Sequence, residues 1–496
     1  MPIAYKRIVV VGGGTAGWMA AIGLATALPG STVELVESEA IGIVGVGEAT
    51  FPMLREFHNR HRIDEADFLR ATNGTFKLGI EFRDWRTKGQ RFFHTFGNFD
   101  DLTGPACLWG QYRRVNDPAL GPLSEQCLPS VMASQGRFAP PPAEQPNLYS
   151  YAYHFDANLY AGFLRGIALK RGARRTEGRI VEVKRRADGG VDQLKLEDGR
   201  VVAGDLFIDC SGFVSLLLGR ALEEPYVDFS RWLPVDRAWA VPSEPSGPGL
   251  TPHTVATALE AGWTWRIPLS NRIGNGHVFA SRYIDEERAR TQLLEQLDGP
   301  ALAEPRLLRF TTGHRERFWV HNVVGLGLSS GFLEPLESTS ILLIQRGLEK
   351  MIELLRPGAR PAAAAVANYN KGMTRVFERI RDFIILHYCL TERRDSQLWR
   401  DMASMELPET LDFKLHAWRQ TGSLNMNGEE GFEATSWLAI HAGMGNWPVR
   451  ADPLLAEVPF EVALQALRQR RDHYAAVVAA MPTHDAFLRR IMRSNN

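Results

Sequence analysis

The sequence predicts an α/β fold that continues into a mainly helical C-terminal region, and three observations lead to this prediction. Residues 7–36 have the pattern of a strand, a glycine-rich turn, a helix and a second strand. Two later strand-like segments, 205–209 and 323–328, also lead into glycines. Beyond Ser340 the apolar residues recur at helical spacing, which favours long helices up to the end of the chain.

Length and composition support a globular protein with more than one domain. The chain has 496 residues, too many for one hydrophobic core, and we expect domains at 1–350 and 351–496. The first of these would contain inserted β-rich and loop segments. With 45% apolar and 23% charged residues, the chain is neither disordered nor collagen-like nor a coiled coil. Its 57 basic and 57 acidic side chains balance, which argues against a nucleic-acid partner.

Neither the cysteines nor the apolar N-terminal stretch indicates secretion. The four cysteines form no CxxC pair, so we expect no disulfide framework and no metal site, and a cytoplasmic protein. Residues 8–28 lack charge, as a signal peptide or membrane span would, but three consecutive glycines interrupt them. We therefore expect no membrane insertion.

The N-terminal segment predicts a βαβ unit. The β-branched run at 7–11 is typical of a buried strand. Residues 15–28 are compatible with a helix that stops at Pro29 and Gly30, and 32–36 predict the second strand.

The rest of the chain predicts mixed structure. Residues 64–85 favour a helix followed by a strand, the Pro- and Gly-rich stretch 104–146 a loop, and 151–170 a helix. The turn at 188–190 predicts a hairpin. Strands are expected at 179–184, 191–196, 205–209, 254–268 and 277–283, and long amphipathic helices at 341–355, 368–387 and 460–480.

A glycine motif lies between the first predicted strand and helix. It has the form GxGxxG, with Thr15 and Ala16 inside it, and its glycines are Gly12, Gly14 and Gly17. In this context the glycines allow a tight turn, the approach of a pyrophosphate and close packing of helix on strand. Glu37 ends the second strand, where a carboxylate can accept hydrogen bonds from the adenosine ribose hydroxyls.

FAD is favoured over NAD as the bound dinucleotide. Only one convincing fingerprint is present, and the strand and turn at 206–212, with Asp209, resemble the second adenine-side strand of flavoprotein monooxygenases. The glycines Gly325 and Gly327 resemble the flavin-proximal loop of that class, although its usual Asp is absent. The predicted fold is therefore a Rossmann-like FAD-binding domain of the flavoprotein monooxygenase type, followed by a helical domain on the substrate side.

Four segments resemble the flavin-dependent halogenases of the tryptophan-halogenase family. Residues 262–268, Gly-Trp-Thr-Trp-Arg-Ile-Pro, match the WxWxIP signature of that family. The segments 45–50, 75–77 and 332–339 also match, in the same order as in the family. The resemblance extends from Gly12 to about Pro448.

The resemblance implies an enzyme in which FADH2 and O2 oxidise chloride or bromide to hypohalous acid. Lys77 would hold or carry the halogen, and Glu337 would orient the hypohalous acid and accept a proton from the arene. For Lys77 this requires an amine that is partly neutral, as burial favours. The backbone N–H groups of Thr339 and Ser340, at a helix N-terminus, would bind the halide. The family usually has glycine where Ser340 stands, which leaves the shape of the halide pocket open.

Further residues of the matching segments have both a family role and an ordinary structural one. Gly47, Glu48 and Ala49 resemble the strap that links the flavin and halide sites; as a plain loop, Gly45 and Gly47 would only permit unusual backbone angles. Trp263 and Trp265 would form a wall between flavin and substrate, or simply part of the core. Ile267 and Pro268 of the same signature are expected to line the substrate tunnel.

The substrate is expected to be an electron-rich arene such as indole or a tryptophan-like compound. By position, His94, Phe96 and Trp437 are candidates to line its pocket. Halogenases of free tryptophan carry a tyrosine-rich stretch near the position of Ser436 and Trp437, and its absence favours an arene without the amino-acid head.

The source of the reduced flavin, the oligomeric state and two competing functions also have to be considered. Without a second nucleotide fingerprint, FADH2 would come from a separate flavin reductase, as the family implies. The sequence does not distinguish a monomer from a homodimer. The competing functions are a single-component FAD hydroxylase, which would insert oxygen instead of halogen, and a flavoprotein that only binds FAD and a partner.

Overall fold

The chain folds into two compact units, each assembled from three segments. The computed structural model describes residues 4–41, 47–246, 249–356 and 359–493. Unit 1 contains Met1–Gly74, Phe155–Asp236 and Arg309–Glu378, and unit 2 contains Thr75–His154, Arg237–Leu308 and Arg379–Asn496. This division differs from the expected one at residue 350, because the largest sheet of unit 2 takes its strands from two segments inserted into unit 1.

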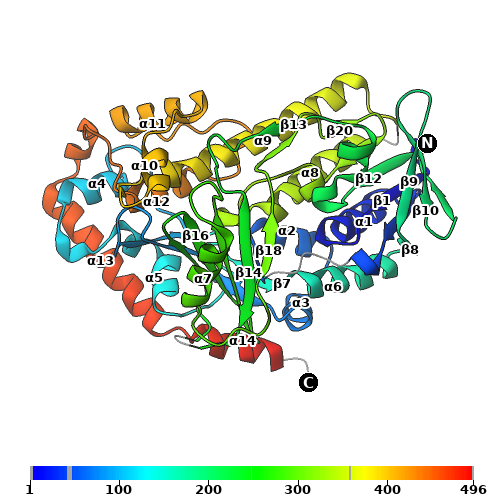
Figure 1. Cartoon of the computed structure of the whole chain (residues 1–496). Helices are drawn as coiled ribbons and strands as arrows, with labels where there is room; N and C mark the ends of the chain where they lie inside the picture. Colours follow the sequence, from blue (N-terminus) through cyan, green and yellow to red (C-terminus); the bar gives the residue numbers. More distant parts are fainter. Residues whose placement is uncertain (1–3, 42–46, 247–248, 357–358, 494–496) are drawn as a thin grey trace. The chain divides into compact units, whose positions relative to one another are not determined.

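A six-stranded sheet forms the centre of unit 1 (Figure 1). Its order is β20-β21-β12-β1-β2-β8, and all neighbours except β20 and β21 run parallel. The apolar residues of β1 are buried, as expected for a strand covered on both faces. The strands are β1 (Arg7–Val11), β2 (Thr32–Glu37), β8 (Arg174–Glu177), β12 (Leu206–Asp209), β20 (Trp319–Val320) and β21 (Val323–Gly325).

The helices of unit 1 confirm the predicted βαβ unit. Helix α1 (Thr15–Ala27) connects β1 to β2 and packs against α6 (Ala157–Lys170) and α8 (Ser340–Leu355). The predicted hairpin is also present, as β9 (Ile180–Arg185) and β10 (Val191–Leu196) pair antiparallel. Further strands and α-helices of this unit are β3 (Gly47–Ala49), α2 (Met53–Arg60), α3 (Glu65–Ala71), β11 (Val201–Ala203), β13 (Tyr226–Asp228), β19 (Gly313–Arg315) and β22 (Gly331–Phe332).

The prediction of one helix over 151–170 is wrong at its start. Strand β7 (Ala152–Asp156) comes first, and α6 begins only at Ala157. The Asp156 carboxylate accepts hydrogen bonds from the backbone N–H groups of Asn158 and Leu159, at 3.0 and 3.1 Å. This cap fixes the helix start, because it satisfies two N–H groups that have no partner within the helix.

Unit 2 is built on a seven-stranded sheet of order β18-β14-β17-β16-β15-β5-β6. The single strand expected at 254–268 is two strands, because the chain turns back between Leu259 and Gly262 with a backbone hydrogen bond of 2.8 Å. The strand expected at 277–283 is β17, and it begins and ends four residues earlier than expected. The strands are β5 (Gly79–Arg83), β6 (Arg91–Thr95), β14 (Arg237–Ser243), β15 (Thr254–Ala258), β16 (Gly262–Pro268), β17 (Ile273–Phe279) and β18 (Arg306–Arg309).

The loop predicted at 104–146 is wrong in part, because it contains two α-helices. These are α4 (Leu108–Val115) and α5 (Leu128–Ser134), and both pack against α13 (Phe460–Ala479), which Figure 1 draws in orange to red beside them. Packing against this distant helix stabilises two helices that are too short to be stable alone. The other helices are α7 (Glu286–Glu295), α9 (Ala363–Cys389, shared with unit 1), α10 (Gln397–Ala403), α11 (Glu409–Thr421), α12 (Ala434–Gly443) and α14 (His484–Arg493).

Three general features bear on the class of protein. Within the described ranges, no helix combines the length and the apolar character that crossing a membrane requires. Among the same residues, no cluster of three or more His, Cys, Asp or Glu side chains is arranged to hold a metal ion. All four cysteines are free thiols, three of them buried.

Candidate functional site

Three glycine-containing loops lie at one edge of the sheet in unit 1. Strands β1, β12 and β21 are adjacent and parallel, so their carboxyl ends share an edge. Cys210 N donates to Val11 O at 2.8 Å, and Leu326 N donates to Asp209 O at 2.9 Å, which ties the ends of these strands together. In open α/β sheets this edge is where ligands bind.

The three glycines of the motif each meet a different steric requirement. Gly12 has a φ of 109°, and a Cβ there would lie 2.3 Å from Cys210 O. A Cβ on Gly17 would lie 1.8 Å from Gly12 O, so this glycine lets α1 approach the turn. Gly14 has nothing within 4 Å of its Cβ position, which leaves open space where a pyrophosphate would approach the backbone.

Glu37 stands over this turn. Its Oε2 atom lies 1.4 Å from where a Cβ on Gly13 would be, so the carboxylate covers that glycine. Its Oε1 atom accepts a hydrogen bond of 2.6 Å from Arg175 Nε. The acid at the end of β2 is thus held close to the glycine turn, as the fingerprint requires.

Asp209 is fully buried and organises the second loop from within. Its Oδ1 atom accepts from Ser211 N at 3.0 Å and from Ser211 Oγ at 2.5 Å. Its Oδ2 atom accepts from Leu217 N and Leu218 N, both at 2.8 Å. Both oxygens therefore bond to the chain itself, so any effect of Asp209 on a ligand acts through the shape of this loop.

The third loop lies against the start of α1. Gly327 has a φ of 68°, and a Cβ there would lie 3.0 Å from the Cβ of Ala16. Thr15 is the first residue of α1, so Gly327 lies beside the helix N-terminus. Gly47 and Ala49 are buried in β3 and Glu48 is half-buried, whereas Gly45 lies outside the described residues.

The start of α8 combines a helix N-terminus with a buried hydroxyl. The helix begins at Ser340, one residue before the expected start, and Thr339 is its N-cap residue. Thr339 is 1% exposed, and its Oγ1 atom has no hydrogen-bond partner among the residues that the structure describes. A buried hydroxyl beside free helical N–H groups suits a small anion. Glu337, in the preceding 3-10 turn Pro335–Glu337, is 2% exposed.

Lys77 is fully buried in unit 2. It is the last residue of β4 (Thr75–Lys77), which pairs antiparallel with β7. Its Nζ atom lies 5.4 Å from the centre of the Phe96 ring. Burial and the positive charge of Lys77 hold the pKa of His154 well below its usual range. Most lysines in proteins are exposed to solvent, so the complete burial of Lys77 is unusual for this residue type.

The two tryptophans of β16 are core residues of unit 2. Trp263 and Trp265 are 1% and 8% exposed, and their ring centres are 6.2 Å apart. Trp263 also contacts Trp85, at 6.4 Å between ring centres. A Cβ on Gly276 would lie 2.1 Å from the Trp265 ring, so this glycine makes room for it.

The far end of β16 is tied to the strand of Lys77. Ile267 is 6% exposed and Pro268 is buried. The Thr75 hydroxyl donates a hydrogen bond of 2.7 Å to Pro268 O. Thr75 lies two residues before Lys77, so this bond connects the wall motif directly to β4.

Two of the three candidate substrate residues share an aromatic cluster. Phe383 lies 5.6 Å from His94 and 5.2 Å from Trp437, between ring centres. The Nζ atom of Lys414 lies 4.2 Å from the centre of the Trp437 ring. Phe96 lies at Lys77 instead. Phe383 and Lys414 are not recognisable from the sequence, because both lie in regular helical patterns that give no local sign of this cluster.

Trp437 is distinctive within that cluster. It is 2% exposed, and its indole N–H has no hydrogen-bond partner within the described part of the chain. Lys414 also pairs with Glu430, so its charge is neutralised where it meets the ring. A buried donor without a partner costs free energy unless a ligand or water satisfies it.

The parallel sheet of unit 1 and its glycine loops define a protein of the Rossmann-like fold class. The profile of the tryptophan halogenase family matches residues 7–460, and the chain belongs to this family. It is therefore an enzyme, an oxidoreductase of the flavin-dependent halogenase class, as the similar proteins below also indicate.

Characterised relatives match over nearly the whole chain. Tryptophan 6-halogenase SttH of Streptomyces toxytricini is 35% identical, over 96% of each chain. Among solved structures, Xcc4156, a flavin-dependent halogenase from Xanthomonas campestris, has a TM-score of 0.94 and 43% identity, over 98% of both chains. BrvH, a flavin-dependent halogenase from Brevundimonas sp. BAL3, has a TM-score of 0.92 and 41% identity, over 98% of this chain and 99% of that one.

Proposed function

We propose that the protein is an FADH2-dependent halogenase that transfers chlorine or bromine to an electron-rich arene such as indole. When bound, the reduced flavin supplies the two electrons with which O2 oxidises halide to hypohalous acid, leaving water as the other product. The observation that carries this proposal is the fully buried lysine, Lys77, in a chain that matches the halogenase family from residue 7 to 460.

The glycine loops of unit 1 would hold FAD. The open position at Gly14 and the N-terminus of α1 suit the pyrophosphate, and Glu37 suits the adenosine ribose. Asp209 would support this site by shaping its loop. The remaining residues that we assign to cofactor binding are Gly12, Thr15, Ala16, Gly17, Gly47, Glu48, Ala49 and Gly327.

The N-terminus of α8 would bind the halide. The backbone N–H groups of Thr339 and Ser340 would donate to it, and the buried Thr339 hydroxyl adds a third donor. Preorganised donors in a dry site bind an anion well, because no water has to be reoriented. Serine at 340 supplies the same backbone donor as glycine would.

Lys77 and Glu337 would carry the halogen transfer. The Lys77 amine would hydrogen-bond the hypohalous acid, or exchange an N–H bond for an N–halogen bond with release of water, and present the halogen to one position of the arene. Glu337 would orient the acid and accept the proton that the arene loses when it regains aromaticity. Both side chains are buried, which strengthens electrostatic interactions and keeps water from competing.

The aromatic residues of unit 2 would select the substrate. The wall of Trp263 and Trp265 would keep the arene from the flavin, and its role needs only the size and rigidity that a core position provides. Ile267 and Pro268 would line the substrate tunnel. His94, Phe96 and Trp437 would line the arene pocket. The Trp437 indole N–H, which has no hydrogen-bond partner among the described residues, supports this assignment.

The reduced flavin would come from a separate flavin reductase, and we place the enzyme in the cytoplasm. The free thiols are consistent with a reducing compartment. We favour indole over free tryptophan, because Lys414, the cation found near Trp437, is already paired with Glu430 and so is poorly suited to bind a second carboxylate.

The test supplies the protein with FAD, a flavin reductase with NADH, oxygen, bromide and indole. The proposal predicts a product with the bromine isotope doublet in its mass spectrum, and faster turnover of indole than of tryptophan. A hydroxylated product without halogen would instead support the single-component hydroxylase. Faster turnover of tryptophan would overturn the substrate preference.

A further inference from the structure

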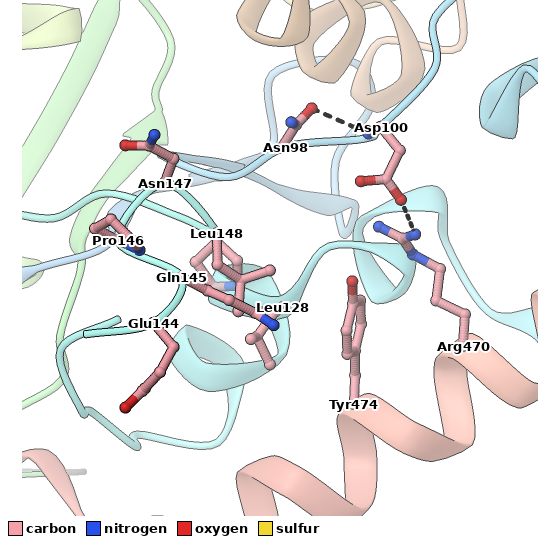
Figure 2. Close-up of a pocket in the computed structure, with 11 residues that line it drawn as sticks. Asn98, Asp100, Leu128, Glu144, Gln145, Pro146, Asn147, Leu148, Arg470 and Tyr474 are labelled. Carbon is pink, nitrogen blue, oxygen red and sulfur yellow. Dashed lines mark hydrogen bonds and ion pairs between the residues drawn. The ribbon is translucent and has the colours of Figure 1, made fainter. Parts of the chain in front are cut away.

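A cavity of about 410 Å³ opens in unit 2 and has no role in the proposed chemistry. Pockets that bind small molecules begin at roughly 300 Å³, so its size suits part of an organic ligand. Figure 2 shows side chains from α13, from the segment after β6 and from the loop before β7 facing this space. Its walls are Asn98, Asp100, Leu128, Pro129, Glu144, Gln145, Pro146, Asn147, Leu148, Arg470 and Tyr474.

The cavity lies along the same stretch of chain as the ring beside Lys77. Asn98 lines the cavity, and it follows Phe96 by two residues, on the order of 7 Å of extended chain. The paired segment also continues: Ser150 N donates to Phe96 O at 2.8 Å, and Gly97 forms a bridge with Tyr149. A ligand whose ring lies at Phe96 could therefore place a short chain in this cavity.

The walls carry hydrogen-bonding groups and a slight excess of negative charge. Asp100 and Glu144 are carboxylates, whereas Arg470 is the one cation among the lining residues. Arg470 is engaged by Asp100, as Figure 2 shows, and its Nε donates to Gln126 O at 2.8 Å. An anionic group would therefore find repulsion here and no free guanidinium.

The uncharged polar groups of the walls indicate the chemistry of the occupant. Side-chain amides and a phenol can both donate and accept hydrogen bonds, and here they are Asn98, Gln145, Asn147 and Tyr474. Leu128, Pro129, Pro146 and Leu148 supply apolar contacts beside them. A neutral amide group attached to a short hydrocarbon chain matches both parts of this lining.

We propose that this cavity binds an uncharged, amide-bearing extension of the aromatic substrate, so that the natural substrate is an arene linked to an amide rather than a free aromatic acid or bare indole. This inference rests on the proposed function, because it assumes that the arene lies at Phe96 and Lys77. It adds a second point of recognition to the same site.

Three compounds that share the indole ring test the proposal in the bromination assay. They are indole, N-acetyltryptamine with a neutral amide chain, and indole-3-propionate with an anionic one. We expect kcat/KM for N-acetyltryptamine to exceed that for indole by about tenfold, as one or two net hydrogen bonds would provide. Indole-3-propionate should be no better than indole. An equal kcat/KM for all three compounds would overturn the inference.

Variants of the walls separate the cavity from the reacting centre. Asn98→Ala and Tyr474→Phe should lower kcat/KM for N-acetyltryptamine toward the value for indole and leave indole turnover unchanged. Asn368→Ala, at an exposed position of α9, is the matched control and should change neither. An advantage of N-acetyltryptamine that survives in both wall variants would overturn the inference.

Removing a negative charge from the cavity wall should raise a kcat/KM value, whereas the two variants above should lower one. Glu144→Gln removes one negative charge at an exposed wall residue and should raise kcat/KM for indole-3-propionate alone. Glu295→Gln, at the exposed end of α7, is its control.

Calorimetry measures binding to the cavity without any turnover. Binding of N-acetyltryptamine to the flavin-free protein that is weakened by Asn98→Ala would support the inference. Failure of all three compounds, indole included, to be brominated would overturn the proposed function itself, whereas bromination of indole without an effect of the chain overturns only this inference.

Discussion

The Nζ atom of Lys77 lies 5.4 Å from the centre of the Phe96 ring, in a part of unit 2 where the lysine has no exposed surface. An ammonium group over an aromatic face is attracted by the ring, and the attraction grows when water is excluded. The same arrangement places the amine beside a residue expected to contact the substrate.

Gly14 and Gly17 should differ sharply when each is changed to alanine. Gly14→Ala should fold normally, because the Cβ enters open space, but should weaken FAD binding by about tenfold or more, or roughly 1.4 kcal/mol, since that space receives the pyrophosphate. Gly17→Ala should instead lower the unfolding free energy by about 1–3 kcal/mol, because its Cβ would lie 1.8 Å from Gly12 O. Fluorescence titration with FAD and urea unfolding measure the two effects. Tight FAD binding by Gly14→Ala would contradict the assignment.

Glu337→Gln should keep FAD binding and lose halogenation. Removing a group that accepts a proton in the transition state lowers kcat by about 10²–10⁴-fold. Glu349→Gln, on the helix α8 that follows the turn of Glu337 and paired with Arg60 at 2.8 Å, is the control and should keep its kcat. Unchanged kcat in Glu337→Gln would show that this acid only stabilises the helix start.

Trp263→Ala should lower the free energy of unfolding by about 3–5 kcal/mol, since it removes a large side chain that is 1% exposed. Trp232→Ala, at a half-buried position of unit 1, should cost clearly less. Urea unfolding of the two variants gives the comparison. A loss as small as for Trp232→Ala would show that Trp263 is not part of the core.

The protein should become less stable as the pH falls below about 6.5. Burial lowers the pKa of His441 to about 3, so the folded state keeps this ring neutral while the unfolded chain takes up a proton near its usual pKa of 6.5. The stability contributed by His441 is therefore present above pH 6.5 and is lost progressively as the pH falls toward 3. The loss amounts to about 1.4 kcal/mol per pH unit.

His441→Phe tests this directly, because it keeps a ring stacked on Trp418, where the ring centres are 4.7 Å apart. Urea unfolding from pH 7.5 to 4.5 should show a shallower pH dependence in His441→Phe than in the original protein. Identical slopes would mean that His441 titrates normally in the folded state.

The βαβ unit and its glycines were predictable because their signals are local. A β-branched run, a glycine turn and a helix stop at Pro29 all lie within 7–36, and the structure confirms β1, α1 and β2. The division into units was not predictable in this way. Strand β5 pairs with β15, which joins Ile80 to Thr254, and no local pattern reports such a pairing.

Candidate site residues could be predicted when they belong to a sequence motif. Residues that only tertiary packing brings to the site could not be predicted. Lys77 is buried at the end of β4, which pairs with β7, and its motif match favoured a buried position. Lys414 and Phe383 were missed, because their helices bring them to Trp437 from separate segments. The Thr339 hydroxyl, which has no partner in the described ranges, also depends on its surroundings rather than on a local sequence pattern.

The most direct test of the central claim replaces Lys77 by alanine and follows bromination of indole together with FAD binding. We predict that Lys77→Ala loses at least about 10³-fold in turnover, within the range for loss of a positioned catalytic group, and binds FAD as before. Lys88→Ala, whose side chain is 70% exposed in the same unit, should retain full activity. Bromination by Lys77→Ala at the original rate would contradict the account.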